Sequence, residues 1–150
     1  SPTSAQDVRD EFGDSVFILD GGECEIGIES TVLGVFEKKI EIYRPGMITE
    51  LMLKNSLPHI EIRRVQSPVA PGQFEHHYQP TVPFYLNESP IESVELKLNK
   101  NPALAARELY MKLRKLSKTS KSIVLKDKDY FHTPEWEPLW DRISKALSNN

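Results

Sequence analysis

Residues 94–125 read VELKLNKNPALAARELYMKLRKLSKTSKSIVL, and this stretch decides the fold of the second half of the chain. An alternating apolar pattern over 94–98 predicts a strand, and the apolar run that ends at Leu125 predicts another. Between them, Asn101-Pro102 is typical of a helix start, because asparagine accepts hydrogen bonds from free N–H groups and proline suits the first turn. The apolar stripe of this helix consists of Ala103, Ala106, Leu109, Tyr110, Leu113 and Leu116.

Strand, helix and strand in this order predict a small α/β layer, and the flanking segments extend it. Phe84-Tyr85-Leu86 predict a further strand, while Thr133-Pro134 begin a last helical region. The apolar face of that region consists of Trp136, Leu139, Trp140, Ile143 and Leu147. We therefore expect residues 82–150 to form a small Rossmann-like α/β domain.

Residues 1–65 show a different order of elements. Helices are expected over residues 2–12 and 50–57. Strands are expected over residues 16–19, 28–36, 40–43 and 60–65. Three strands in a row imply a partly antiparallel sheet, so this part is interpreted as α+β. Four prolines over residues 68–83 then exclude a helix, and residues 66–81 are interpreted as an ordered linker between the two parts.

Composition limits the classes of function. The chain has 150 residues, with 19 basic and 22 acidic side chains and a net charge of −3, so it has no overall attraction for nucleic acid or an anionic membrane. Cys24 is the only cysteine, which excludes an intrachain disulfide and a zinc site built from several cysteines. The sequence contains no apolar run of membrane-spanning length. We expect a cytoplasmic protein with no membrane partner.

Two side chains are placed where they could meet a phosphate. Thr3 lies at the start of the first helix, where free N–H groups and the helix dipole favour an anion. From the sequence alone, an ordinary helix cap is the favoured explanation, and both roles are compatible. Arg44 follows a strand in the turn Arg44-Pro45-Gly46, and its guanidinium could hold a phosphate through two hydrogen bonds. The ordinary alternative is a solvated arginine in a turn.

Three further residues are candidates for contacts with a small molecule. Ser30 lies in Glu29-Ser30-Thr31, which interrupts an apolar strand, and it would face the opposite side of the sheet from its two neighbours. His77 and Tyr78 lie in the proline-rich linker, where an imidazole and an aromatic ring could close over a base or a phosphate. Adjacent histidines in extended chain point apart, so we predict no metal site at His76-His77.

Together these motifs resemble the threonylcarbamoyl-AMP synthase family, the YrdC or TsaC type in its longer two-domain form. The motifs that carry the resemblance are Ser1-Pro2-Thr3-Ser4-Ala5, Leu19-Asp20-Gly21-Gly22, Gly27-Ile28-Glu29-Ser30-Thr31-Val32, Tyr43-Arg44-Pro45-Gly46, Pro71-Gly72-Gln73 and His77-Tyr78-Gln79-Pro80. The tail resembles the family's appended domain, in the helix at 105–116 and in Trp140-Asp141-Arg142-Ile143. The resemblance implies an α+β catalytic-domain fragment of YrdC type followed by the small α/β domain.

The resemblance also implies an activity. Members of the family make L-threonylcarbamoyladenylate and pyrophosphate from L-threonine, bicarbonate and ATP, for threonylcarbamoyladenosine modification of tRNA. It assigns ATP contacts to Thr3, Arg44, His77 and Tyr78, and a threonine contact to Ser30. It implies ATP as a substrate with Mg²⁺ on its phosphates, no protein-bound metal and no covalent catalytic residue. Expected partners are other tRNA-modification proteins, with indirect or weak tRNA contact, and a second copy of the chain in a homodimer.

The family's Lys-x-Arg and Ser-x-Asn elements precede Ser-Pro-Thr, so the resemblance implies the carboxyl-terminal half of such an enzyme. We expect this nucleotidyltransferase fragment to be inactive alone. One alternative is a non-catalytic tRNA- or partner-binding module that uses the basic face of the helix at 102–116. Salt-sensitive tRNA binding that survives Arg44→Ala would favour it. Another is a related carbamoyl-transfer enzyme or RNA-binding relative with the same catalytic fold.

Overall fold

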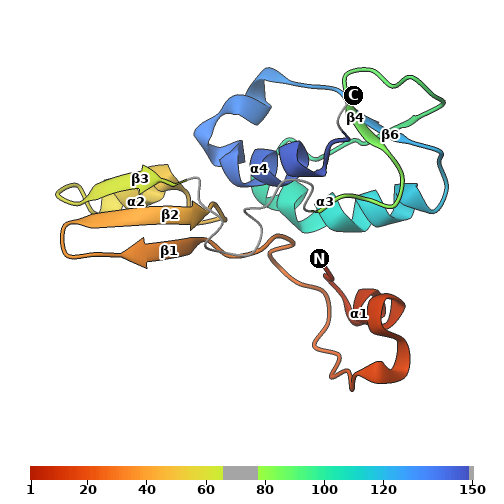
Figure 1. Ribbon diagram of the computed structural model, residues 1–150, viewed down its shortest axis with the longest axis horizontal. Helices are drawn as coiled ribbons and strands as arrows, with labels where there is room; N and C mark the ends of the chain where they lie inside the picture. The colour runs from red at the N-terminus through yellow and green to blue at the C-terminus, as the bar shows by residue number, and fades with distance from the viewer. Residues whose placement is uncertain (66–77, 149–150) are drawn as a thin grey trace.

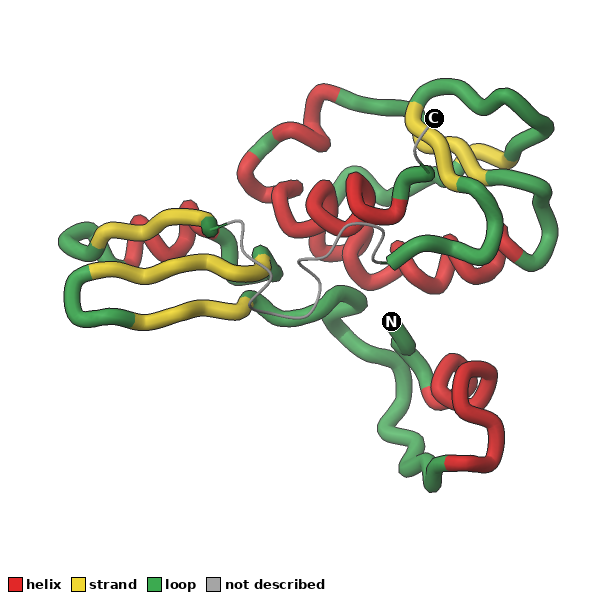
Figure 2. The backbone as a smooth tube through the Cα atoms, viewed as in Figure 1, coloured by secondary structure: helices red, strands yellow, loops and turns green. Residues whose placement is uncertain are grey.

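The computed structural model describes residues 1–65 and 78–148, and its strands form two separate three-stranded sheets (Figure 1). The first sheet, with helix α2 beside it, lies to the left of Figure 1, and the second sheet lies at the upper right, above helix α3 and to the right of α4. Helix α1 (Ala5–Phe12) stands below α3 and is joined to the first sheet by a long loop, which Figure 2 shows in green. The mixed α/β fold that the sequence predicted is confirmed.

The first sheet has the strand order β1-β2-β3. Strand β1 (Val32–Val35) pairs antiparallel with β2 (Lys39–Arg44), and β2 pairs in parallel with β3 (Glu61–Arg64). Helix α2 (Glu50–Ser56) makes the crossover between the two parallel strands, as such a pair requires. The small core between sheet and helix consists of Ile40, Ile42 and Ile62, with Leu33, Leu53 and Ile60 at its margin.

The second sheet is all parallel, with the order β4-β6-β5. Its strands are short: β4 (Phe84–Leu86), β5 (Val94–Glu95) and β6 (Ile123–Leu125). Helix α3 (Pro102–Ser117) connects β5 to β6, and its Asn101 cap accepts hydrogen bonds from the N–H groups of Ala103 and Leu104. Two short 3₁₀ turns (Asp129–His132 and Pro134–Trp136) lead into α4 (Glu137–Ala146), which packs against α3.

The main core fills the space between this sheet and helices α3 and α4. It contains fifteen buried residues, among them Phe84, Leu109, Ile123 and Leu139. Ile28, from the first part of the chain, is buried in the same core, and Gly27 beside it allows the close approach. A Cβ atom on Gly27 would lie 2.4 Å from the carbonyl oxygen of Ala106. The segment before β1 is therefore anchored to α3; the proposed division into residues 1–65, 66–81 and 82–150 stays a prediction.

One predicted strand is wrong. Residues 16–19 form no strand, and the side chains of Phe17 and Leu19 are 90% and 88% exposed. The run has the composition of a buried strand, but a strand needs a partner, and it pairs with no other strand in the part of the chain that the structure describes.

Three other predicted bounds also shift. The strand expected over 28–36 is limited to Val32–Val35, because Thr31 donates a side-chain hydrogen bond to the Ile48 carbonyl and Gly46 lies against the Thr31 N–H. The first helix begins at Ala5, because Ser4 and Asp7 form a capping box. The strand expected over 94–98 ends at Glu95.

Helix α1 buries no residue and is attached to α3 by charged groups. The Asp7 carboxylate accepts hydrogen bonds from the N–H and hydroxyl of Thr3, at 2.8 and 3.0 Å, and also pairs with Arg114 of α3. Lys118 pairs with Asp10 at 3.2 Å. Burial is the largest effect on the pKa of Asp7 and works to raise it, but the hydrogen bonds from Thr3 and the charge of Arg114 together lower that pKa.

Two leucines of α3 test where the stability of the fold resides. Leu109 is 1% exposed in the main core, whereas Leu104 is 50% exposed on the same helix. We expect Leu109→Ala to lower the free energy of unfolding by about 2–5 kcal/mol and Leu104→Ala by about 0.5 kcal/mol or less, measured by urea unfolding. Equal losses for the two variants would contradict this assignment of the core.

The pH dependence of stability tests the attachment of α1. Because the folded-state pKa of Asp7 lies below its ordinary value, its contacts stabilise the protein above about pH 4, and this contribution is lost as the pH falls through the lowered pKa. We expect Asp7→Asn to lower the free energy of unfolding at about pH 7, and the difference from the natural chain to shrink at about pH 2.5. The exposed Asp14→Asn serves as the control. An equal loss at both pH values would refute the ionic attachment.

Candidate functional site

An ion pair between the buried Arg142 and the partly buried Glu29 lies at the centre of the candidate site. Arg142 projects from α4, and its side chain is fully buried. Its Nε donates to the Glu29 carboxylate at 3.1 Å, and its Nη2 donates to the Glu29 carbonyl at 3.2 Å. Its Nη1 donates to the carbonyl of Pro45. One guanidinium therefore joins a helix of the second part to two loops of the first.

Glu29 has two further partners. The Tyr110 hydroxyl of α3 donates to its carboxylate at 3.1 Å, and the Ser1 hydroxyl does the same. Burial is the largest effect on the pKa of Glu29 and works to raise it, but the Ser1 hydrogen bond and the charge of Arg142 outweigh burial and lower that pKa. Burial, reinforced by the charge of Glu29, raises the pKa of Tyr110. Glu29 is thus an ionised acceptor and Tyr110 a protonated donor at neutral pH.

A second buried carboxylate, Asp141, extends the charge network. It is 4% exposed and pairs with Arg142 at 3.2 Å, with Lys145 at 2.8 Å, and with Arg64 of β3. Arg64 also reaches Glu137 at 3.2 Å. Buried charges are tolerated only when they are paired, and both the buried Asp141 and the partly buried Glu29 have a cationic partner.

Two of the predicted site residues lie side by side. Arg44, at the end of β2, donates from Nε to the carbonyl of Ser30 at 3.1 Å, so the turn Arg44-Pro45-Gly46 lies against the loop Glu29-Ser30-Thr31. Gly46 is required at this contact, because a Cβ atom there would lie 2.2 Å from the Thr31 nitrogen. The Ser30 side chain is exposed and is not part of a strand, so its predicted place on one face of a sheet is wrong.

Tyr78 lies beside the same ion pair. Its ring centre is 5.6 Å from the guanidinium carbon of Arg142 and 5.8 Å from the ring centre of Tyr110. Its φ of 72° places the backbone in the left-handed region, which is uncommon for a residue other than glycine. Burial, with the nearby Glu29 charge, raises the pKa of its hydroxyl. His77 lies outside the described residues.

Thr3 is connected to the site only indirectly. Its N–H and hydroxyl bond to Asp7, and its hydroxyl also accepts from Arg114 at 2.8 Å. The prediction that Thr3 belongs to a helix cap is therefore confirmed, and the anion at the start of the helix is the Asp7 carboxylate. The connection to Glu29 runs through Ser1, whose hydroxyl bonds to that carboxylate. An ATP contact of Thr3 stays a prediction.

Sequence reasoning missed three residues that organise this site: Glu29, Tyr110 and Arg142. Tyr110 was read as part of an apolar stripe, which is correct for its ring but omits its hydroxyl. The signal for Arg142 is Asp141-Arg142 between Trp140 and Ile143, a charged pair within a helix face that is otherwise apolar. Two opposite charges that stand between apolar core residues in the sequence of a helix predict a buried ion pair.

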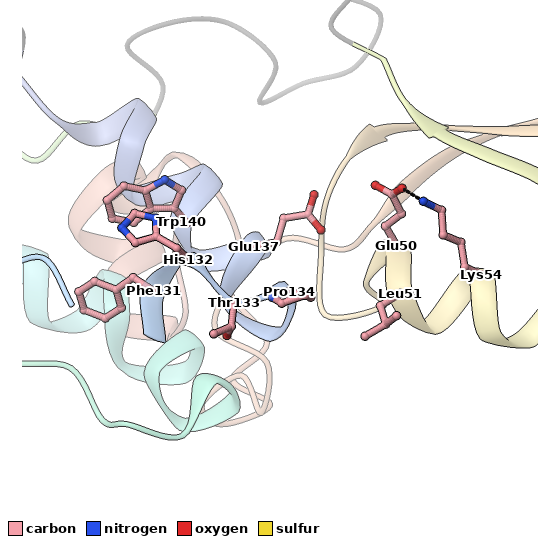
Figure 3. A pocket seen from close by; sticks show the side chains of 9 residues that line it. All are labelled: Glu50, Leu51, Lys54, Phe131, His132, Thr133, Pro134, Glu137 and Trp140. Carbon is pink, nitrogen blue, oxygen red and sulfur yellow. Dashed lines mark ion pairs between the residues drawn. The ribbon is translucent and has the colours of Figure 1, made fainter. Parts of the chain in front are cut away.

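A cavity between α2 and the turns before α4 lies away from this site. It has a volume of 460 Å³ and separates α2 from the turns before α4, and Figure 3 shows Glu50 and Lys54 across the gap from Trp140 and His132. None of the predicted site residues lines it. Its carboxylates are already paired, Glu50 with Lys54 at 2.5 Å and Glu137 with Arg64 at 3.2 Å, so its charges favour no ionic ligand.

Two searches of the described residues gave no candidates. Over residues 1–65 and 78–148, no three histidine, cysteine, aspartate or glutamate side chains come together as metal ligands. Within the same residues, no helix has both the length and the apolar character needed to span a membrane.

Comparison with known proteins identifies relatives of the chain. The family model for Sua5, YciO and YrdC, described as telomere recombination, matches residues 1–46. A threonylcarbamoyl-AMP synthase of Pyrococcus abyssi is 34% identical over 105 residues, which are 65% of this chain and 31% of that protein. A threonylcarbamoyl-AMP synthase of Bacillus subtilis is 34% identical over 101 residues, which are 63% of this chain and 29% of that protein. The chain thus spans about a third of the curated relatives it matches.

Solved structures show the same fold. Sua5 of P. abyssi complexed with L-threonine matches with a TM-score of 0.78 at 24% identity, over 97% of this chain and 54% of that one. A P. abyssi Sua5 variant, with a histidine and the following tyrosine both replaced by alanine, matches with a TM-score of 0.78 at 23% identity, over 97% and 53%. The resemblance to threonylcarbamoyl-AMP synthases that the motifs predicted is therefore confirmed, with the Sua5, YciO and YrdC family model matching residues 1–46.

Proposed function

We propose that this chain forms the threonine side and part of the nucleotide side of a threonylcarbamoyl-AMP synthase. The reaction joins L-threonine, bicarbonate and ATP into L-threonylcarbamoyladenylate, with release of pyrophosphate, for tRNA modification in the cytoplasm. The observation that carries the proposal is the contact between Arg44 and Ser30, 3.1 Å from Nε to the carbonyl oxygen, beside the buried pair of Glu29 and Arg142. The two curated relatives bear the name of this activity.

The proposed roles follow from the chemistry of each side chain. Ser30 is small, polar and exposed at the loop surface, which suits a hydrogen bond to the threonine substrate. Arg44 suits the phosphates, because its planar guanidinium can neutralise charge that develops during adenylyl transfer. L-threonine and bicarbonate first condense through the threonine amine to N-threonylcarbamate with loss of water. A carbamate oxygen then attacks the α-phosphorus of ATP, the bond from the α-phosphorus to the oxygen that bridges to the β-phosphorus breaks, and pyrophosphate leaves. Mg²⁺ would accompany the phosphates of ATP.

Tyr78 and His77 are proposed to close over the nucleotide. Tyr78 already packs beside Arg142 and Tyr110, so a ring in this position would border any ligand held by Ser30 and Arg44. The chain contains one His-Tyr dipeptide, His77-Tyr78, and one of its structural neighbours carries alanines in place of such a pair. Another structural neighbour is a complex with L-threonine, which supports threonine as the ligand.

The whole reaction is proposed only for a longer protein. The chain covers 54% of a solved neighbour and 31% of a curated relative. Among the basic residues of the chain, Arg44 alone is assigned to the phosphates, and one arginine is too little for the charge of ATP with its departing pyrophosphate. We therefore propose that the 150-residue chain binds L-threonine without turning over.

The alternative of a tRNA-binding face on α3 has less support. Three of its cations are paired with carboxylates: Arg107 with Glu23, Lys112 with Glu108, and Arg114 with Asp7. Paired cations attract phosphate backbones less than free ones, because each partner carboxylate must first be displaced.

Binding of L-threonine tests the proposal. We expect L-threonine to shift the backbone amide signals of Ser30 and Thr31 in NMR spectra, and Ser30→Ala to weaken this binding by about tenfold through loss of a hydrogen bond to a charged ligand. Ser15→Ala is the matched control, because Ser15 is an exposed serine far along the chain from the loop. D-threonine should bind more weakly than L-threonine. Unchanged affinity in Ser30→Ala would overturn the assignment of Ser30.

Turnover is measured separately. With ATP, L-threonine and bicarbonate, we expect this chain to release no pyrophosphate above background. A release that depends on both threonine and bicarbonate would contradict the proposed inactivity while leaving the binding assignment intact.

A further inference from the structure

We propose that Arg142 is a positioning residue for the site, which fixes the distance between Ser30 and Arg44 from the far side of the core. The expected effect of Arg142 on threonine binding rests on the proposed function. The expected effect of Arg142 on the order of the two loops rests only on the contacts of Arg142. The contacts of Arg142 in the two loops are with Glu29 and with the Pro45 carbonyl. It acts through the backbone groups next to Ser30 and Arg44.

The two main-chain groups that Arg142 holds are next to the two predicted binding residues. The Glu29 carbonyl belongs to the peptide bond that leads into Ser30, and Arg142 Nη2 donates to it at 3.2 Å. The Pro45 carbonyl belongs to the residue after Arg44, and Arg142 Nη1 donates to it. Because a guanidinium is rigid and planar, its two donors set the separation of the two carbonyls, and with it that of the two loops.

Two further contacts hold the same two loops. Nε of Arg142 holds the Glu29 side chain at 3.1 Å, which fixes both the carbonyl and the carboxylate of one residue. On the other side of the two loops, Arg44 donates to the Ser30 carbonyl at 3.1 Å. The loops are therefore joined from both sides, with Arg142 on the buried side and Arg44 on the accessible side.

The placement of Arg142 explains why such a costly residue lies in the core. A fully buried guanidinium carries a large desolvation penalty, and an apolar side chain of similar volume is often no less stable. Asp141, next to it in sequence, balances part of its charge at 3.2 Å. Through Arg142, helix α4 thus holds the two loops that contain Ser30 and Arg44. Helix α4 is in this way a component of the proposed site.

Arg64 provides a matched control. It belongs to the same charge network, and its ion pairs are with Asp141 and Glu137 of α4 and not with either loop in the described part of the chain. Arg64→Met therefore removes an arginine from the network without releasing Ser30 or Arg44. Arg142→Met releases both loops, and Arg142→Lys keeps the charge but loses the planar fork.

The test is backbone ¹⁵N relaxation of the 150-residue chain. In the natural chain and in Arg64→Met, we expect order parameters near about 0.85 at Ser30, Thr31 and Gly46; in Arg142→Met they should fall toward about 0.6, while core amides such as Leu109 stay rigid. L-threonine should bind about tenfold more weakly to Arg142→Met than to Arg64→Met. If Arg142→Met does not fold, Arg142→Lys is compared with Arg64→Met by the same measurements.

The outcomes separate the two proposals. Loop order parameters that stay high in the Arg142 variants, or that fall equally in Arg64→Met, overturn the positioning role. If the loops loosen as expected but the natural chain does not bind L-threonine, the positioning role holds and the proposed function fails.

Discussion

The fold of this chain depends on one buried charge pair, Arg142 with Glu29. Hydrophobic burial explains the second sheet and its two helices, but it provides no directional contact between that core and the loops before β1 and after β2. The guanidinium provides it, with one charged and two main-chain acceptors in those loops. Removing Arg142 would leave the partly buried Glu29 carboxylate without its cation, and removing Glu29 would leave the buried Arg142 with Asp141 as its remaining charged partner.

This arrangement relates the two parts of the chain in a specific way. Ile28 is buried in the main core, and the residue after it, Glu29, is held by α3 and α4. The first sheet, in contrast, has its own small core of three isoleucines. The candidate site lies where these two bodies meet, so its geometry depends on both. An enzyme that must bring threonine and a nucleotide together gains from such a fixed junction, because small displacements of the reacting groups are costly to rate.

The sequence predicted the elements whose pattern is local. Helix α3 was predicted from Asn101-Pro102 and its apolar stripe, and the structure has it at Pro102–Ser117. Residues 16–19 were predicted as a strand and are not one, because apolar composition does not show whether a partner strand exists. Ser30 and Arg44 were identified as candidates, but their contact could not be predicted, since it depends on Arg142 nearly a hundred residues later. Long-range ionic contacts leave almost no periodic signal in a sequence.

The central claim is that Arg142 and Glu29 act as a unit, and a double-mutant cycle measures this directly. The free energies of unfolding of Glu29→Gln, Arg142→Met and the double variant are compared with that of the natural chain. We expect a coupling energy of at least about 1.5 kcal/mol, because the second substitution removes a group that has already lost its partner in the first. Effects that add to within about 0.5 kcal/mol would contradict it, because independent sites behave in that way.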